Sequence, residues 1–170
     1  MRCNVMLIRE YRADDLPRII EIFEDTVNNV CRADYAPTQI SAWLGADYSG
    51  WDRRYRESFT LVAEAEGEIV AFGNLVAGAA ACGRVCGGHT LGSDDGYLDM
   101  LYTAKNYLRR GVASALCKEL EKTVRGDIYA DVSKTALPFF LARGYEIITP
   151  QQVTRRGVKI GNFACVKRRT

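Results

Sequence analysis

Short, mainly apolar stretches recur along the chain, and between several of them the apolar positions repeat with the 3.6-residue period of a helix. The apolar stretches predict strands at residues 5–11, 59–65, 69–76, 97–103, 127–133, 145–153 and 158–166. The helical period predicts helices at residues 16–30, 38–44, 50–58, 111–124 and 135–143. Elements in this order predict a mixed α/β domain built around one sheet.

Glycine-containing turns show how some of these elements are joined. Glu66-Gly67-Glu68 lies between two predicted strands, and Arg155-Arg156-Gly157 lies between the last two, so each pair is expected to form an antiparallel hairpin. Residues 78–96 are rich in Gly, Ala, Ser and Asp and predict a long, mobile loop insert. Because no repeat or linker divides the 170 residues, we expect a single domain over residues 1–170.

Charge and hydropathy narrow the class of protein. A net charge of +2 is too small to argue for nucleic acid or an anionic membrane as a partner. No apolar run reaches the ~20 residues that a membrane span needs. Within the first ten residues, charged residues follow the apolar stretch too soon for a signal peptide. We therefore expect a cytoplasmic protein that binds neither nucleic acid nor membrane.

The six cysteines are scattered, unlike the dense spacing of a secreted disulfide framework. Cys82, Cys86 and His89 have a spacing that suggests a metal site. Zinc sites usually show a second pair of ligands, however, and the sequence has none at a suitable spacing. We therefore predict small residues in a glycine-rich loop and no bound metal.

The most informative stretch is residues 107–116, where a predicted strand is followed by a glycine turn and a helix. The first N–H groups of a helix lack partners within it, and together with the helix dipole they favour bound anions. Arg109 and Arg110 add positive charge beside Gly111. The stretch therefore predicts a site for a phosphate or pyrophosphate. Neither a mononucleotide P-loop nor a dinucleotide-binding glycine motif matches it.

The chain resembles the GNAT superfamily of acyl-CoA-dependent N-acetyltransferases at three places. Residues 108–113 match the family's pyrophosphate loop, Arg/Gln-x-x-Gly-x-Gly/Ala, except that Leu108 stands at its first position. Residues 136–145 resemble the later Ala-x-x-Phe-Tyr-x-x-x-Gly-Phe signature, and residues 8–15 resemble the usual start of the family. A narrower likeness, at Tyr35-x-Pro37-x-Gln39-x-x-x-Trp43 and two later segments, is to a poorly characterised bacterial group.

The resemblance implies a fold and a cofactor. The fold would be a central mixed, mostly antiparallel sheet of about seven strands, flanked by helices and splayed at the cofactor strand. The cofactor would be acetyl-CoA, with its pantetheine arm on the backbone of Leu101, Tyr102 and Thr103. The loop residues implied to hold the pyrophosphate are Leu108, Arg109, Arg110, Gly111, Val112, Ala113 and Ser114. The later signature adds Phe139, Phe140 and Arg143 on the cofactor side.

The resemblance also implies a proton acceptor near the thioester. Asp99 is an acidic residue in an otherwise apolar strand, and we expect it to be that base, with Tyr97 holding a relay water. The alternative is a structural aspartate that binds a loop. The family's usual general acid, a tyrosine, aligns with Phe140, which cannot donate a proton. Residues that could substitute for it are Tyr102, Tyr129, Tyr145 or a cysteine.

Aromatic residues gather in the early region that the resemblance assigns to the acceptor. Tyr35, Trp43 and Trp51 are the candidates to line a pocket there, although each could instead be core. The implied activity is transfer of an acetyl group to a primary amine of a small molecule or peptide, in a protein for which a homodimer is plausible by family analogy. Two alternatives stay open: a catalytically weak acyl-CoA sensor or scaffold, and a nucleotide-binding module.

Overall fold

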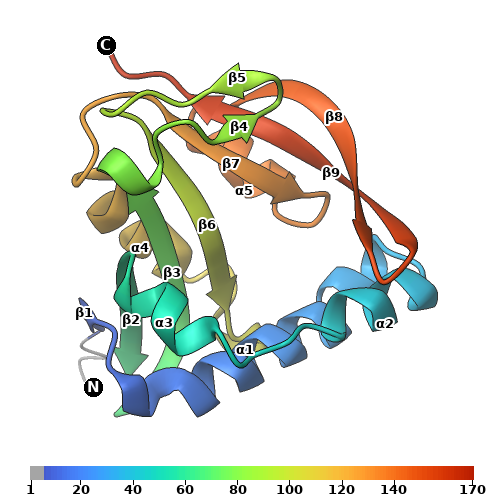
Figure 1. Ribbon diagram of the computed structural model, residues 1–170. Helices are drawn as coiled ribbons and strands as arrows, with labels where there is room; N and C mark the ends of the chain where they lie inside the picture. Colours follow the sequence, from blue (N-terminus) through green and yellow to red (C-terminus); the bar gives the residue numbers. More distant parts are fainter. Residues whose placement is uncertain (1–5) are drawn as a thin grey trace.

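The computed structural model describes residues 6–170 and shows one twisted sheet with helices on both faces (Figure 1). Among these residues, seven strands form the sheet in the spatial order β1 (Leu7–Glu10), β2 (Phe59–Ala65), β3 (Glu68–Ala77), β6 (Gly96–Thr103), β7 (Ile128–Ser133), β9 (Val158–Lys167) and β8 (Glu146–Arg155). All neighbours are antiparallel except β6 and β7. The mixed, mostly antiparallel sheet of seven strands is therefore confirmed.

The parallel pair β6–β7 separates soon after it begins. Its register runs from Gly96 opposite Ile128 to Leu98 opposite Ala130, although both strands continue beyond these residues. We call the opening between the two strands the fork. The fork confirms the predicted splay of the sheet at the β6 strand.

The α-helices of the described chain are α1 (Leu16–Asn29), α2 (Pro37–Leu44), α3 (Trp51–Arg56), α4 (Val112–Glu121) and α5 (Leu137–Ala142). Each lies within or close to a predicted helix. The fourth helix begins one residue later than predicted because Gly111, at φ 79°, lies in the left-handed region just before it. The strand predicted from Val5 begins at Leu7, and Val5 itself lies outside the described residues.

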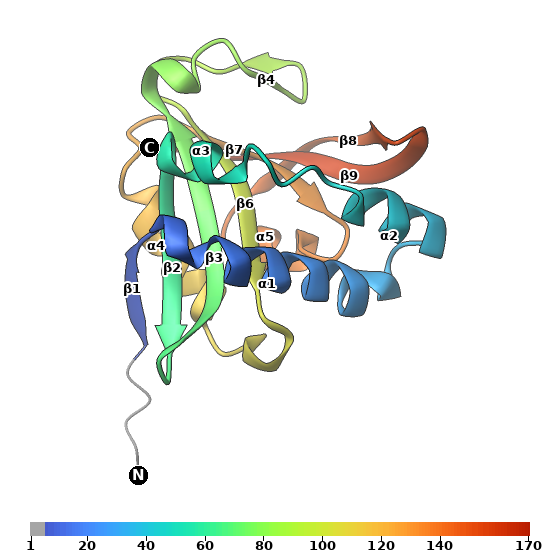
Figure 2. The same cartoon turned by 60° about the horizontal axis from the view of Figure 1, so that its bottom comes forward.

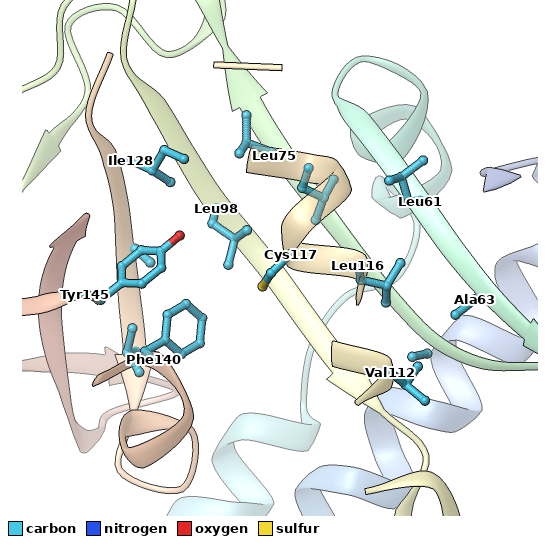
Figure 3. Packing of buried hydrophobic residues seen from close by; sticks show 14 of the residues in the cluster. Leu61, Ala63, Leu75, Leu98, Val112, Leu116, Cys117, Ile128, Phe140 and Tyr145 are labelled. Carbon is cyan, nitrogen blue, oxygen red and sulfur yellow. The ribbon is translucent and has the colours of Figure 1, made fainter. Parts of the chain in front are cut away.

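Apolar side chains fill both faces of the sheet. On one face, α4 contributes Val112, Leu116 and Cys117 to a cluster that includes Leu98 of β6 and Phe140 of α5 (Figure 3). On the other face, residues of α1, α2 and α3 pack against β2, β3 and β6. Figure 2 shows α1 lying across the sheet on this second face. The sheet therefore lies between two packed apolar layers.

Residues 78–96, expected to be a mobile loop insert, have secondary structure of their own. They form a 3-10 turn at Gly78–Ala80 and a small hairpin of β4 (Val85–Cys86) and β5 (His89–Thr90). Ala81, Cys86 and Leu91 are buried against Tyr97 and Tyr129. Figure 2 shows the hairpin projecting beyond the end of the sheet. The apolar residues scattered among the glycines explain why this segment packs.

No helix within residues 6–170 combines the length and the apolar character needed to cross a membrane.

Candidate active site

A cavity of about 840 Å³ runs from the β6–α4 loop, through the fork, to the region of α1 and α2. It brings together sixteen of the eighteen residues predicted for the site, and these include catalytic, cofactor-binding and acceptor-binding candidates. Those that line it are Tyr35, Trp43, Trp51, Tyr97, Asp99, Leu101, Tyr102, Thr103, Leu108, Arg109, Gly111, Val112, Ala113, Ser114, Phe139 and Phe140. Arg110 and Arg143 are not among its lining residues.

The β6–α4 loop has the geometry of an anion cradle. Arg109 and Gly111 both take positive φ values, 59° and 79°, which turn the chain sharply into α4. The backbone N–H of Ala115 donates to the carbonyl of Gly111 (3.0 Å). The three N–H groups before it find no carbonyl within the described chain. The N–H groups of Val112, Ala113 and Ser114 therefore remain available for an anion.

The three arginines predicted near the cofactor differ in their surroundings. Arg109 lines the cavity. Arg110 lies beside it, with its guanidinium 5.3 Å from the ring centre of Tyr107. Arg143 does not line the cavity: its guanidinium donates to the buried carboxylate of Glu121 (2.9 Å) and to the Ser114 carbonyl (3.4 Å). The structure therefore does not bring Arg143 to the cavity, and its visible role is an ion pair that ties α5 to α4.

The β6 strand presents a backbone edge to the cavity beyond the fork. Residues Leu101 to Thr103 pair with β3 on one side, while the β7 pairing has ended at Leu98. The Thr103 carbonyl accepts a hydrogen bond from the Thr26 hydroxyl (3.2 Å). Within the described residues, no strand pairs with the other edge of this segment. Its free backbone groups are suited to an extended amide-containing arm.

Asp99 occupies a β-bulge in β6, since Asn74 pairs with Met100 and Leu75 pairs with Leu98. Its carboxylate lines the cavity but is bound bidentately by Arg54, at 2.7 and 2.6 Å. The Asn74 amide also donates to it (3.3 Å). The side chain of Asp99 is only 8% exposed, whereas that of Arg54 is 40% exposed, so the pair is buried on its carboxylate side and reaches water on its guanidinium side. A proton from an amine can reach Asp99 only in competition with Arg54.

Tyr97 points to a second carboxylate, Asp131 of β7, which was not among the predicted residues. The Tyr97 hydroxyl donates to Asp131 (2.6 Å), as does the Gln151 amide (2.6 Å). Burial and the negative charge of Asp131 raise the pKa of Tyr97, so it remains a proton donor. Like Asp99, Asp131 is an acidic residue within an apolar strand, and that signal could have identified it from sequence.

The cavity wall contains Phe140 where the family resemblance places a tyrosine general acid. Phe140 is buried and packs edge-on against Tyr145, with ring centres 4.9 Å apart. Tyr145 donates to Glu121 (3.2 Å) and, like Tyr129, is not a lining residue. Of the named substitutes for the general acid, Tyr102 and Cys31 line the cavity. Burial raises the pKa of both, so each carries a proton at neutral pH.

The aromatic residues predicted for the acceptor serve as core and as cavity wall at once. Tyr35 is buried; its hydroxyl donates to Gly161 (2.8 Å) and accepts from the backbone of Lys134 (2.8 Å). Its ring meets Trp43 edge-on, with centres 5.4 Å apart. Trp51 is buried against Phe23. These contacts fix the far end of the cavity as a rigid aromatic pocket.

The Cys82, Cys86 and His89 spacing does not form a metal site. Cys86 is buried and its thiol donates to Asp131 (3.5 Å), whereas Cys82 is exposed. Across residues 6–170, no three His, Cys, Asp or Glu side chains gather as a metal ion would require.

Thiol reactivity gives a direct test of this burial. With a thiol reagent at pH 8, we expect Cys82 to react rapidly and Cys31, Cys86, Cys117 and Cys165 to react after unfolding. Burial raises the pKa of Cys86 and of Cys117 to about 12, and that of Cys165 to about 11, so little reactive thiolate forms at pH 8. Peptide mapping after brief labelling measures this. Rapid labelling of Cys117 in the native protein would contradict its burial. Cys3 lies outside the described residues.

Comparisons with known proteins identify the family of this chain. The sequence model of the Acetyltransferase (GNAT) family matches residues 17–145. An uncharacterized N-acetyltransferase of Escherichia coli strain K12, YafP, is 33% identical over 160 residues, which is 94% of this chain and 94% of YafP.

Solved structures show the same fold. A GCN5-related N-acetyltransferase from Rhodopseudomonas palustris superimposes with a TM-score of 0.82 at 26% identity, over 99% of this chain and 98% of that one. The PaiA N-acetyltransferase from Thermoplasma acidophilum, solved in complex with coenzyme A, gives a TM-score of 0.71 at 17% identity, over 97% and 99% of the two chains. The chain belongs to the GNAT acetyltransferase family.

Proposed function

We propose that this protein is a cytoplasmic N-acetyltransferase that moves an acetyl group from acetyl-CoA to a primary amine of a small molecule or peptide by direct transfer. The observation that carries the proposal is the continuity of the cavity. A helix-end anion cradle, a free strand edge and an aromatic pocket open into one space. A donor held at one end can therefore meet an acceptor held at the other.

The residues at the cradle fit coenzyme A. The free N–H groups of Val112, Ala113 and Ser114 would bind its pyrophosphate, with Arg109 adding positive charge. The unpaired edge of β6 would bind the amides of the pantetheine arm. Bound acetyl-CoA supplies a thioester as the acyl donor. The relative from Thermoplasma acidophilum that was solved with coenzyme A supports this choice of cofactor.

The chain's own groups then act on the reaction. A backbone N–H of β6 beyond the bulge would stabilise negative charge on the oxygen of a bound thioester. Phe140 holds the cavity wall but cannot protonate a leaving thiolate. Tyr102 and Cys31, which line the cavity as protonated groups, are the available proton donors, and water at the open end is the alternative.

The experiment is release of free CoA thiol from acetyl-CoA across a panel of primary amines. We expect amine-dependent release with formation of the matching acetamide. Phe140 favours one competing function, a catalytically weak acyl-CoA sensor of the same fold. Saturable binding of acetyl-CoA with no release on any amine would favour the sensor and overturn the enzyme.

A further inference from the structure

Two carboxylates stand at the mouth of the fork, one on each strand. The last paired residues of β6 and β7 are Leu98 and Ala130. Asp99 and Asp131 directly follow them, and both line the cavity. An acceptor amine that reaches the fork from the aromatic pocket therefore passes between two acidic side chains.

The two carboxylates differ in what neutralises them. Asp99 has a full ion pair with Arg54, at 2.6 Å. Asp131 accepts hydrogen bonds from neutral donors alone: Tyr97 (2.6 Å), Gln151 (2.6 Å) and the thiol of Cys86 (3.5 Å). Among residues 6–170, no Lys, Arg or His lies within ion-pair distance of Asp131. Asp131 is exposed to solvent, so water solvates its negative charge until a cationic ligand takes the place of that water.

A second acceptor near Asp131, the side-chain oxygen of Asn162, also lacks a hydrogen-bond donor within the described residues. Ser133 shares a sheet face with Asp131, and Asn162 pairs with Ser133 across β9. Asn162 lines the cavity, and its buried side-chain oxygen has no hydrogen-bond partner in the described part of the chain. Gln151, which holds Asp131, is the register partner of Asn162 on β8. A charged carboxylate and an unsatisfied oxygen together suit a ligand with several N–H donors.

We propose that Asp131, oriented by Tyr97 and Gln151, binds the ammonium group of the acceptor and accepts its proton, and that the Asp99–Arg54 pair positions β6. This inference rests on the proposed function. The ammonium gives one proton to the Asp131 carboxylate, and the neutral nitrogen bonds to the acetyl carbon. The carbon–sulfur bond breaks, the thiolate takes up a proton to give CoA thiol, and the remaining proton is released to water.

The test compares acceptors that differ in charge but hardly in shape. 2-Phenylethylamine is an ammonium ion at pH 7, whereas O-benzylhydroxylamine, in which oxygen replaces the CH2 next to the nitrogen, is neutral and nucleophilic. A panel of such amine and alkoxyamine pairs is assayed by thiol release with the wild type, Asp131→Asn and Tyr97→Phe. Asp127→Asn is the matched control, because Asp127 lies just before the same strand and pairs with Arg168, outside the cavity.

Loss of a general base typically lowers turnover by about 10²–10⁴-fold, so we expect Asp131→Asn to lower kcat/KM for amines by at least about 100-fold. Turnover of the neutral alkoxyamines should change little, and CoA affinity should be retained. Tyr97→Phe keeps the ring but removes the donor, and should give a smaller loss with the same preference for alkoxyamines. Asp127→Asn should match the wild type with both classes.

If Asp131→Asn lowers kcat/KM equally for amines and alkoxyamines, the inference is overturned. It is also overturned if Asp99→Asn, rather than Asp131→Asn, shows the loss confined to amines. If the wild type turns over no acceptor, the proposed function fails, and binding then decides the inference separately. Calorimetric titration of 2-phenylethylamine into the CoA-saturated protein should show binding that Asp131→Asn abolishes. Equal affinity in both proteins, or none in the wild type, would overturn it.

Discussion

Replacing Ala113 by aspartate is expected to weaken CoA binding by at least about 100-fold, or about 2.7 kcal/mol, without unfolding the protein. Ala113 lies in the first turn of α4 and lines the cavity, beside N–H groups that have no partner in the described chain. A carboxylate there would face the pyrophosphate. Two unit charges 4 Å apart repel by about 4 kcal/mol at an effective dielectric constant of about 20.

The same substitution should leave stability unchanged or raise it, because aspartate in a first helical turn interacts favourably with the helix dipole by about 0.3–1 kcal/mol. Ala113→Asn, which has the same shape without the charge, is the control and should lose far less affinity. Titration calorimetry gives the affinity, and urea unfolding gives the stability. An unchanged affinity in Ala113→Asp would remove this loop as the phosphate cradle.

Replacing Glu121 by alanine is expected to have the largest effect on stability. Its buried carboxylate accepts from Arg143 (2.9 Å), Lys167 (2.8 Å) and Tyr145 (3.2 Å), and so joins α4 to α5 and β9. Removing one partner of a buried ion pair costs about 3–5 kcal/mol, because the remaining charge is uncompensated. The side chains of Arg143 and Lys167 are 18% and 23% exposed, and some access to water favours the lower value.

Thermal unfolding should show this loss as a decrease in Tm of about 6–12 °C for a domain of this size. Glu119→Ala is the matched control on the same helix. Glu119 pairs with Lys122 on the surface, with 41% of its side chain exposed, and such pairs contribute about 0–1 kcal/mol. Equal decreases for the two variants would contradict a special role for the buried cluster.

The sequence predicted most of the fold because its signals are local. The apolar run over residues 59–65 and the turn at Glu66 and Gly67 specify the β2–β3 hairpin without any distant contact. The small hairpin within residues 78–96 depends on distant contacts instead. The packing of Leu91 and Cys86 depends on Tyr97 and Tyr129, which composition alone does not place beside them.

The site residues likewise fall into those that local sequence predicts and those that depend on distant contacts. Gly111 and the helix after it form a local motif, and the structure places that motif at the cavity. Charge partners are not local: Arg54 lies 45 residues from Asp99, and Tyr97 lies 34 residues from Asp131. The tertiary fold alone decides which carboxylate has an ion-pair partner. It also decides that Arg143 pairs with Glu121.

The measurement that tests the central claim most directly is calorimetric titration of the wild-type protein with acetyl-CoA and, separately, with ATP. The cavity, with its anion cradle opening onto the free edge of β6, predicts saturable binding of acetyl-CoA and far weaker binding of ATP. Tight binding of ATP without binding of acetyl-CoA would contradict it.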